Sequence, residues 1–386
     1  MMKNQNEKAI VNAHIVLPDS IILDGVIIIR DGRIDSFGEG REVSVPVGAE
    51  VIDARGHYAG PGFVDIHTHA GGGVWFYDDP EKAASHHLDH GTTSILPALY
   101  YNLTLEQLMD AIRRIKAASA KGDARIIAGL YMEGPYLNPK DGCEASSNRW
   151  ADGVDPAGYR PLIEAAGGFA RVWCIAPELP GIGQFVDDLT AVNKAAVLAV
   201  AHSEASPAQI FRYVEQGLRL ATHHTNATGD LQKYPECRGV CVDEAVNLCD
   251  DIYAELICDS RGIHVDPLML RLVVKTKGRD KVILVSDCFV ADGPVPPGYE
   301  GVTDINFDHA GEIAGSKLTL DVACRNMMRH TGAGICDVFR YAAYNPARLL
   351  GLRDVGRIAQ GALANIVIVD HVMNVRHVLF EGQQVR

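Results

Sequence analysis

Hydrophobic residues near both ends of the chain form short β-branched runs separated by turn residues. One pair of runs lies on either side of Asp31-Gly32, and residues 364–369 form a similar run near the C-terminus. An Asp-Gly pair between apolar runs is a strong signal for a β-hairpin with a two-residue loop. We therefore predict that residues 1–60 and 352–386 together build a small β-sandwich domain.

The middle of the chain alternates between near-continuous apolar runs and amphipathic helical patterns. Thr104 and Gln107 form a capping box before one such helical pattern. The eight apolar runs are residues 62–66, 93–99, 125–132, 171–176, 195–201, 218–222, 252–258 and 281–286. Such runs are typical of parallel strands buried on both faces, and eight repeats close a (β/α)8 TIM barrel, which we predict over residues 61–351. A doubly wound open sheet is the alternative, but no G-x-G-x-x-G motif follows the first run.

Potential metal ligands follow directly after several of the predicted strands. In a TIM barrel the active site lies at the carboxyl ends of the strands. Five of the eight runs end in His, Glu or Asp residues, namely His67, His69, Glu133, His202, His223 and Asp287. A single strand-end histidine is more often a satisfied polar residue than a ligand, but six such residues converging on one face favour a metal site. Imidazole and carboxylate ligands together suit Zn²⁺ or Fe²⁺.

Four other histidines near these runs are not expected to bind the metal. His86, His87 and His90 fall on one predicted helix, and we interpret them as surface or packing residues. His224 adjoins His223, but successive side chains of an extended segment point to opposite faces. We therefore predict that His224 is not a ligand itself and either packs against the ligands or lies in the core.

Composition and charge narrow the class of protein. Of the 386 residues, 36 are Lys or Arg and 49 are Asp or Glu, which gives a net charge of −13 and argues against a nucleic-acid partner. The longest apolar stretches fall far short of the roughly 20 residues that span a bilayer, and no signal-peptide pattern is visible. We expect a soluble, cytoplasmic protein with no membrane partner. Nine cysteines without a C-x-x-C pair indicate reduced thiols, and a structural zinc site at Cys237 and Cys241 is the less favoured alternative.

Several short segments, taken in order, carry a resemblance to a known family. They are PGFVDIHTH at 61–69, MEGPYL at 132–137, APE at 176–178, AHS at 201–203, THHTNA at 222–227, LVSD at 284–287 and IAGSKLT at 313–319. These segments resemble the amidohydrolase superfamily, in particular its N-acetylglucosamine-6-phosphate deacetylase branch. The Glu-Gly-Pro sequence is the most discriminating, because hydantoinase-like relatives commonly bridge two metals with a carboxylated lysine where the deacetylases use this glutamate.

The resemblance implies a ligand set and a catalytic residue. Glu133, His202 and His223 would hold one divalent ion, which we expect to be Zn²⁺ with Fe²⁺ as the alternative. A second ion would be held by His67, His69, Glu133 and Asp287. Such an ion polarises an amide carbonyl and lowers the pKa of a water molecule. Asp287 would take the proton of the attacking water and deliver it to the leaving amine.

The resemblance also implies a substrate. The residues expected to contact it are Asn226, Ala227, Arg238, His264 and Ala314. The family arginine reaches a phosphate bound by the neighbouring subunit, so we expect a homodimer, with Lys233 as the alternative to Arg238. The family histidine that polarises the substrate carbonyl is absent from residues 138–148.

The sequence therefore predicts an enzyme that removes the acetyl group from an N-acetylated amino sugar. N-acetylglucosamine 6-phosphate and its epimer N-acetylgalactosamine 6-phosphate are the expected substrates. A different amidohydrolase, acting on an N-acyl amino acid, a cyclic amide or a deaminable ring, is the alternative enzyme. A non-catalytic binding protein on the same scaffold is disfavoured, because every metal-type residue is retained.

Overall fold

Eight parallel strands form a nearly closed barrel in the computed structural model, which describes residues 7–141, 147–229, 236 and 239–386. The order of strands around the barrel follows the sequence, and every neighbouring pair is parallel. The strands are β6 (Phe63–Thr68), β9 (Thr92–Tyr100), β10 (Leu130–Glu133), β11 (Ala170–Ile175), β12 (Val197–Val200), β13 (Leu218–Ala221), β14 (Tyr253–Ile257) and β15 (Val282–Val285). The predicted TIM barrel is confirmed.

The first and last barrel strands meet through Asp65 and the backbone of His67. The backbone N–H of Asp287 donates to the carbonyl of His67 (2.9 Å). The buried Asp65 carboxylate accepts from the backbone N–H groups of His67 and Ser286, each at 3.3 Å. These bonds place the ends of β6 and β15 side by side, and with them the two segments that carry His67, His69 and Asp287.

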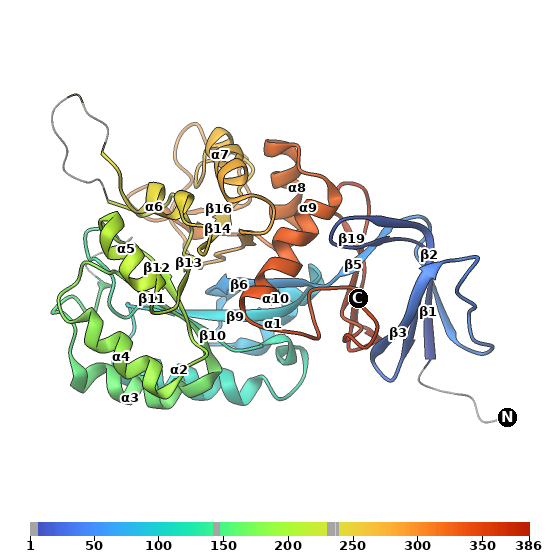
Figure 1. Ribbon diagram of the computed structural model, residues 1–386, viewed down its shortest axis with the longest axis horizontal. Coiled ribbons are helices and arrows are strands. Elements are labelled where there is room, and N and C mark those ends of the chain that lie inside the picture. The colour runs from blue at the N-terminus through green and yellow to red at the C-terminus, as the bar shows by residue number, and fades with distance from the viewer. Residues whose placement is uncertain (1–6, 142–146, 230–235, 237–238) are drawn as a thin grey trace.

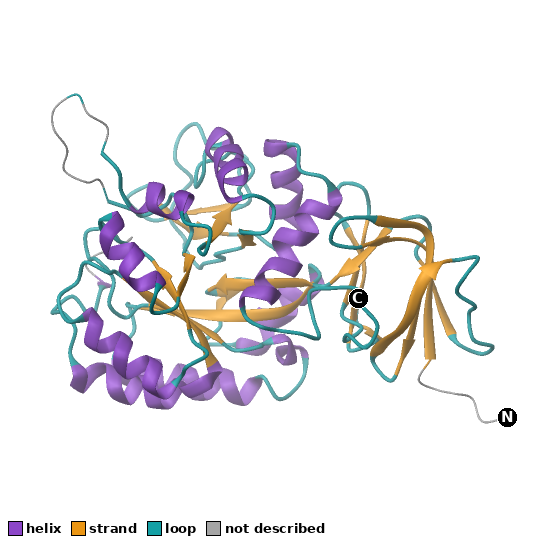
Figure 2. Cartoon of the chain, in the orientation of Figure 1, coloured by secondary structure: helices purple, strands orange, loops and turns teal. Residues whose placement is uncertain are grey.

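Helices cover the outside of the barrel (Figure 2). They are α1 (Pro80–Asp89), α2 (Leu105–Ala118), α3 (Pro156–Ala166), α4 (Ile182–Val192), α5 (Pro207–Val214), α6 (Val242–Leu248), α7 (Pro267–Lys277), α8 (Leu320–Thr331), α9 (Ile335–Phe339) and α10 (Asn345–Leu349). The capping box predicted at Thr104 and Gln107 is present at the start of α2. Each described helix is too short or too polar to span a bilayer, and a cytoplasmic location stays a prediction.

One predicted strand begins later than the apolar run suggested. The sequence favoured a strand over residues 125–132, but Asp123–Ile126 form a 3-10 helix and β10 begins only at Leu130. Gly122 adopts a positive φ of 55°, and the backbone N–H of Asp123 donates to the Glu81 carboxylate (2.8 Å). The chain is thus turned toward α1 before it enters the barrel, a contact that a local hydrophobic pattern does not encode.

Strands from both ends of the chain form a second sheet beside the barrel (Figure 1). Its strands are β1 (Glu7–Val16), β2 (Ile21–Arg30), β3 (Arg33–Glu39), β4 (Glu50–Asp53), β5 (Tyr58–Pro61), β18 (Ile366–Val369), β19 (Val375–Phe380) and β20 (Gln383–Gln384). Asp31 and Gly32 have φ values of 50° and 76° between the paired strands β2 and β3, so the predicted hairpin is confirmed. The domain boundaries at residues 60 and 352 stay a prediction.

Two short hairpins lie at the mouth of the barrel, after β6 and after β15. They are β7 (Ala70–Gly71) with β8 (Val74–Trp75), and β16 (Ile305–Phe307) with β17 (Ile313–Ser316). Among the described residues all seven cysteines are free thiols, as predicted. Cys237 lies outside the described residues, so the alternative zinc site at Cys237 and Cys241 has no structural account.

Candidate metal centre

The six residues predicted as metal ligands meet at the carboxyl ends of the barrel strands. His67 lies on β6 with His69 just beyond it, Glu133 ends β10, and the other three follow β12, β13 and β15 by two residues. All six are buried, with exposed fractions between 0% and 8%. Their convergence follows from the parallel barrel, in which all strands end at the same face.

Three of these residues adopt a backbone conformation that is uncommon for residues other than glycine. His202, His223 and Asp287 have φ values of 42°, 27° and 45°. A positive φ costs free energy in a residue with a Cβ atom, and such strain gathers at functional sites where the surrounding structure holds it. The strain occurs where the chain leaves β12, β13 and β15, directly at the cluster.

One group of ligand atoms consists of a Glu133 oxygen and two imidazoles. Glu133 Oε1 lies 2.8 Å from His202 Nε2 and 3.2 Å from His223 Nε2, and the two Nε2 atoms are 3.1 Å apart. The Nδ1–H of His202 donates to the carbonyl of Asp141 (2.8 Å), and that of His223 donates to the carbonyl of Asn226 (3.2 Å). Because each Nδ1 carries the proton, the Nε2 lone pairs can face a shared ion.

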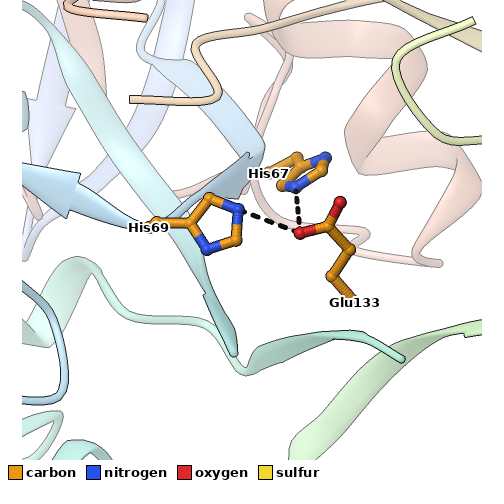
Figure 3. A group of neighbouring side chains, drawn as sticks. All are labelled: His67, His69 and Glu133. Atoms are coloured by element: carbon orange, nitrogen blue, oxygen red, sulfur yellow. Dashed lines mark ion pairs between the residues drawn. The ribbon is translucent and has the colours of Figure 1, made fainter. Parts of the chain in front are cut away.

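A second group uses the other oxygen of the same glutamate. Glu133 Oε2 lies 3.0 Å from His69 Nε2 and 3.7 Å from His67 Nε2, as the dashed lines in Figure 3 mark. Asp287 Oδ1 lies 3.4 Å from His69 Nε2 and 3.8 Å from His67 Nε2. His67 Nε2 is buried and has no hydrogen-bond partner. Such an orphaned nitrogen is costly unless a ligand takes its lone pair.

Each of the two groups could hold a divalent cation, and Glu133 belongs to both groups. The potential ligand atoms of His67, His69 and Glu133 lie within 4.8 Å of one another, and so do those of Glu133, His202 and His223. Neutral imidazoles with a carboxylate are the donors that Zn²⁺ and Fe²⁺ accept. The described residues are thus compatible with a divalent metal.

The charges in this cluster stabilise an ionised Glu133. Burial alone raises the pKa of a carboxyl group, but the four imidazoles around Glu133 together outweigh burial and hold the pKa of Glu133 well below its ordinary value. The cluster therefore presents a carboxylate, as metal binding requires.

A cavity of about 80 Å³ opens onto the cluster. Of the residues predicted to contact a substrate, Asn226, Ala227 and His264 line this cavity. Ala314 is buried on β17, and its neighbours Ile313 and Gly315 are lining residues. Arg238 and its alternative, Lys233, lie outside the described residues.

One wall of the cavity consists of neighbouring aromatic rings, which the sequence interpretation did not predict. Tyr100, Tyr101 and Phe289 line the cavity, and the rings of Tyr100 and Phe289 lie 5.1 Å and 5.4 Å from that of His69. Tyr100 and Tyr101 follow the second predicted strand, and Phe289 lies two residues beyond Asp287. Their position just after predicted strands is the same sequence signal that identifies the metal ligands.

His264 is held at the cavity by a buried carboxylate. Asp259 Oδ2 accepts from the backbone N–H of His264 (2.8 Å) and lies 3.0 Å from its ring Nδ1. Asp259 also accepts from the backbone N–H groups of Arg261 (2.9 Å) and Ile263 (3.0 Å). Burial alone raises the pKa of Asp259, but the hydrogen bonds from His264 and Ile263 lower it to about 2.

The histidines assigned to other roles lie away from the cavity. His87 is fully buried, with Nε2 2.8 Å from the carbonyl of Ala70. His224 is buried, does not line the cavity, and donates its backbone N–H to the carbonyl of Glu255 (2.8 Å). Both positions agree with the packing roles predicted from the sequence.

Comparison with known proteins places this geometry in a family. The sequence model described as "Amidohydrolase family" matches residues 58–385. The N-acetylglucosamine-6-phosphate deacetylase of Bacillus subtilis is 27% identical over 374 residues, covering 92% of this chain and 91% of that protein. The N-acetylgalactosamine-6-phosphate deacetylase of Escherichia coli O157:H7 is 27% identical over 352 residues, covering 88% of this chain and 90% of that protein.

Solved structures of such deacetylases have the same fold. The N-acetylglucosamine-6-phosphate deacetylase of Pasteurella multocida superposes with a TM-score of 0.84 at 25% identity, covering 98% of this chain and 99% of that one. A Mycobacterium smegmatis deacetylase variant in complex with N-acetyl-D-glucosamine-6-phosphate gives a TM-score of 0.82 at 26% identity, with the same coverage. With a family match that spans most of its length and a barrel of the same architecture, the chain belongs to the amidohydrolase family.

Proposed function

We propose that this protein is a metal-dependent deacetylase that hydrolyses an N-acetylated amino sugar phosphate to acetate and the amino sugar phosphate. The substrate is N-acetylglucosamine 6-phosphate or N-acetylgalactosamine 6-phosphate, because relatives of both names match about nine-tenths of the chain. The observation that carries the proposal is the position of Glu133, whose two oxygens face two different imidazole pairs at the mouth of the barrel.

We assign the metal ligands from these contacts. One ion would be held by Glu133, His202 and His223, and a second by His67, His69, Glu133 and Asp287. Zn²⁺ is the ion that this donor set suits best, with Fe²⁺ as the alternative. When bound, the ion polarises the amide carbonyl and acidifies a water molecule.

Asp287 acts as the proton carrier in this proposal. Its carboxylate lines the cavity beside His69, at 3.4 Å from Nε2. It accepts the proton of the attacking water as the new C–O bond forms. It then returns that proton to the amine nitrogen as the C–N bond breaks, so the sugar leaves as a neutral amine. No Ser or Cys nucleophile is needed.

Other residues that line the cavity or adjoin its lining contact the sugar in this proposal. We assign Asn226, Ala227, His264 and Ala314 to the sugar and Arg238 to its phosphate. Because the corresponding arginine of the family reaches the neighbouring subunit's phosphate, we propose a homodimer.

A second candidate function rests on the aromatic wall. Tyr100, Tyr101 and Phe289 line the cavity, and none of its described lining residues is Lys or Arg. An amidohydrolase of an N-acyl amino acid, a cyclic amide or a deaminable ring would need no phosphate contact and would gain from apolar walls.

A substrate panel separates the two functions. Acetate release is measured with the metal-loaded protein on N-acetylglucosamine, N-acetylgalactosamine, their 6-phosphates and several N-acetyl amino acids. We expect one of the 6-phosphates to be hydrolysed with a kcat/KM at least about tenfold above its free sugar, because one charge-assisted hydrogen bond contributes about 1.5 kcal/mol or more. Hydrolysis of an N-acetyl amino acid with no acetate from any sugar would establish the second function.

A further inference from the structure

A fully buried glutamate that is not one of the proposed metal ligands contacts two of them, His67 and His223. Glu255 lies on β14 and has no exposed surface. Its Oε2 atom is 3.1 Å from Nδ1 of His67, which is equally buried. Interior positions of TIM-barrel strands are usually filled by Val, Ile or Leu, and a buried carboxylate is costly unless it is paired. The position of Glu255 therefore calls for an explanation beyond packing.

The same carboxylate oxygen also contacts the other half of the cluster. Glu255 Oε2 accepts from the backbone N–H of His223 at 3.1 Å. His223 is one of the residues with positive φ, so this bond helps to hold a strained backbone in place. One oxygen atom thus joins a residue of the His67 group to a residue of the His202 group.

The hydrogen bond to Glu255 decides which nitrogen of His67 carries the proton. A carboxylate only accepts, so Nδ1–H of His67 donates to it and Nε2 keeps a free lone pair. That Nε2 atom faces Glu133 Oε2 at 3.7 Å and Asp287 Oδ1 at 3.8 Å. The ring of Tyr131 stacks on the His67 ring, with a centroid distance of 4.3 Å and an angle of 13° between the planes. The orientation of the imidazole is therefore fixed by this stacking as well as by the hydrogen bond to Glu255.

We propose that Glu255 is a positioning residue for the metal centre: it fixes the tautomer and orientation of His67 and braces the backbone of His223. This inference rests on the proposed metal-dependent function. Its physical basis is general, because a carboxylate behind a ligating histidine orients the ring and increases its basicity. Replacing such a partner typically weakens metal binding about 10- to 100-fold.

Metal affinity measured on three variants tests the proposal. Glu255→Leu removes both hydrogen bonds, whereas Glu255→Gln keeps a neutral oxygen acceptor of the same reach. Asp370→Asn is the matched control, since Asp370 is a buried carboxylate that accepts from Asn374 and Arg376 in the terminal sheet. Zn²⁺ binding is measured by equilibrium dialysis, and Co²⁺ absorption spectra report the ligand geometry independently of turnover.

We expect Glu255→Leu to weaken the binding of the ion at His67 about 10- to 100-fold and Glu255→Gln to weaken it by a smaller factor of about 3 to 10. The Co²⁺ spectrum should change in both, and Asp370→Asn should match the wild type. Wild-type affinity and an unchanged spectrum in a folded Leu variant would overturn the proposal. If the Leu variant does not fold, the same result in Glu255→Gln would overturn it. A wild-type protein that binds no ion would instead refute the proposed function itself.

Discussion

The replacement Asp259→Asn tests how the loop that carries His264 is held. In the wild type the Asp259 carboxylate accepts from the backbone N–H groups of Arg261, Ile263 and His264 and contacts the His264 ring. An asparagine side chain keeps one oxygen acceptor and loses the charge. The variant should therefore loosen this loop and with it the side of the cavity formed by His264.

The pKa of Asp259 gives the size of the effect. Hydrogen bonding in the folded protein overcomes burial and lowers this pKa from its ordinary value of 3.8 to about 2. Since a pKa difference of one between the folded and unfolded states corresponds to about 1.36 kcal/mol, the ionised carboxylate stabilises the fold by about 2 kcal/mol. Because the folded pKa is the lower one, this contribution is complete above pH 4 and disappears as the pH falls through about 2.

Urea unfolding of both proteins between pH 7 and pH 2 measures the effect. The wild type should be more stable than Asp259→Asn by about 2 kcal/mol at pH 7, and the difference should shrink below pH 4. Asp266→Asn is the control, because asparagine is an equally good N-cap for α7 and should change little at any pH. A stability difference that stays constant from pH 7 to pH 2 would refute the reasoning.

Three further replacements test the proposed assignments. His202→Asn should lose bound metal and turnover together, and full activity without metal would contradict its role as a ligand. Asp287→Asn should lower kcat by about 10²-fold or more with little change in substrate affinity, whereas more than about a tenth of wild-type kcat would rule out the proton-carrier role. Arg238→Ala should lower kcat/KM about 10- to 100-fold for the 6-phosphate sugar alone, and equal losses on the free sugar would rule out phosphate recognition.

The barrel and the ligand cluster were predictable because their signals are local. Continuous apolar runs mark buried parallel strands, and the carboxyl ends of such strands must meet at one face. His202 and Asp287 could be identified by their place after a run, without knowledge of their partners. The resemblance to a family then supplied roles that position alone does not give.

Other features depend on contacts between distant parts of the chain. Glu255 lies inside an apolar run, and the sequence gives no sign of its partner, because His67 is 188 positions away. The turn at Asp123 depends on Glu81, which lies on α1. Neither hydrophobic periodicity nor motif spacing encodes such pairings, because each is created only when the strands and helices pack.

The most direct test of the metal-dependent function is a titration of the metal-free protein. The ion is removed with a chelator, and Zn²⁺ is added back in measured equivalents while acetate release from N-acetylglucosamine 6-phosphate and N-acetylgalactosamine 6-phosphate is followed. We predict no turnover without metal, and recovery on at least one of the two sugars that rises with bound ion and ends at one or two equivalents. Acetate release that persists in the metal-free protein would contradict the proposed function.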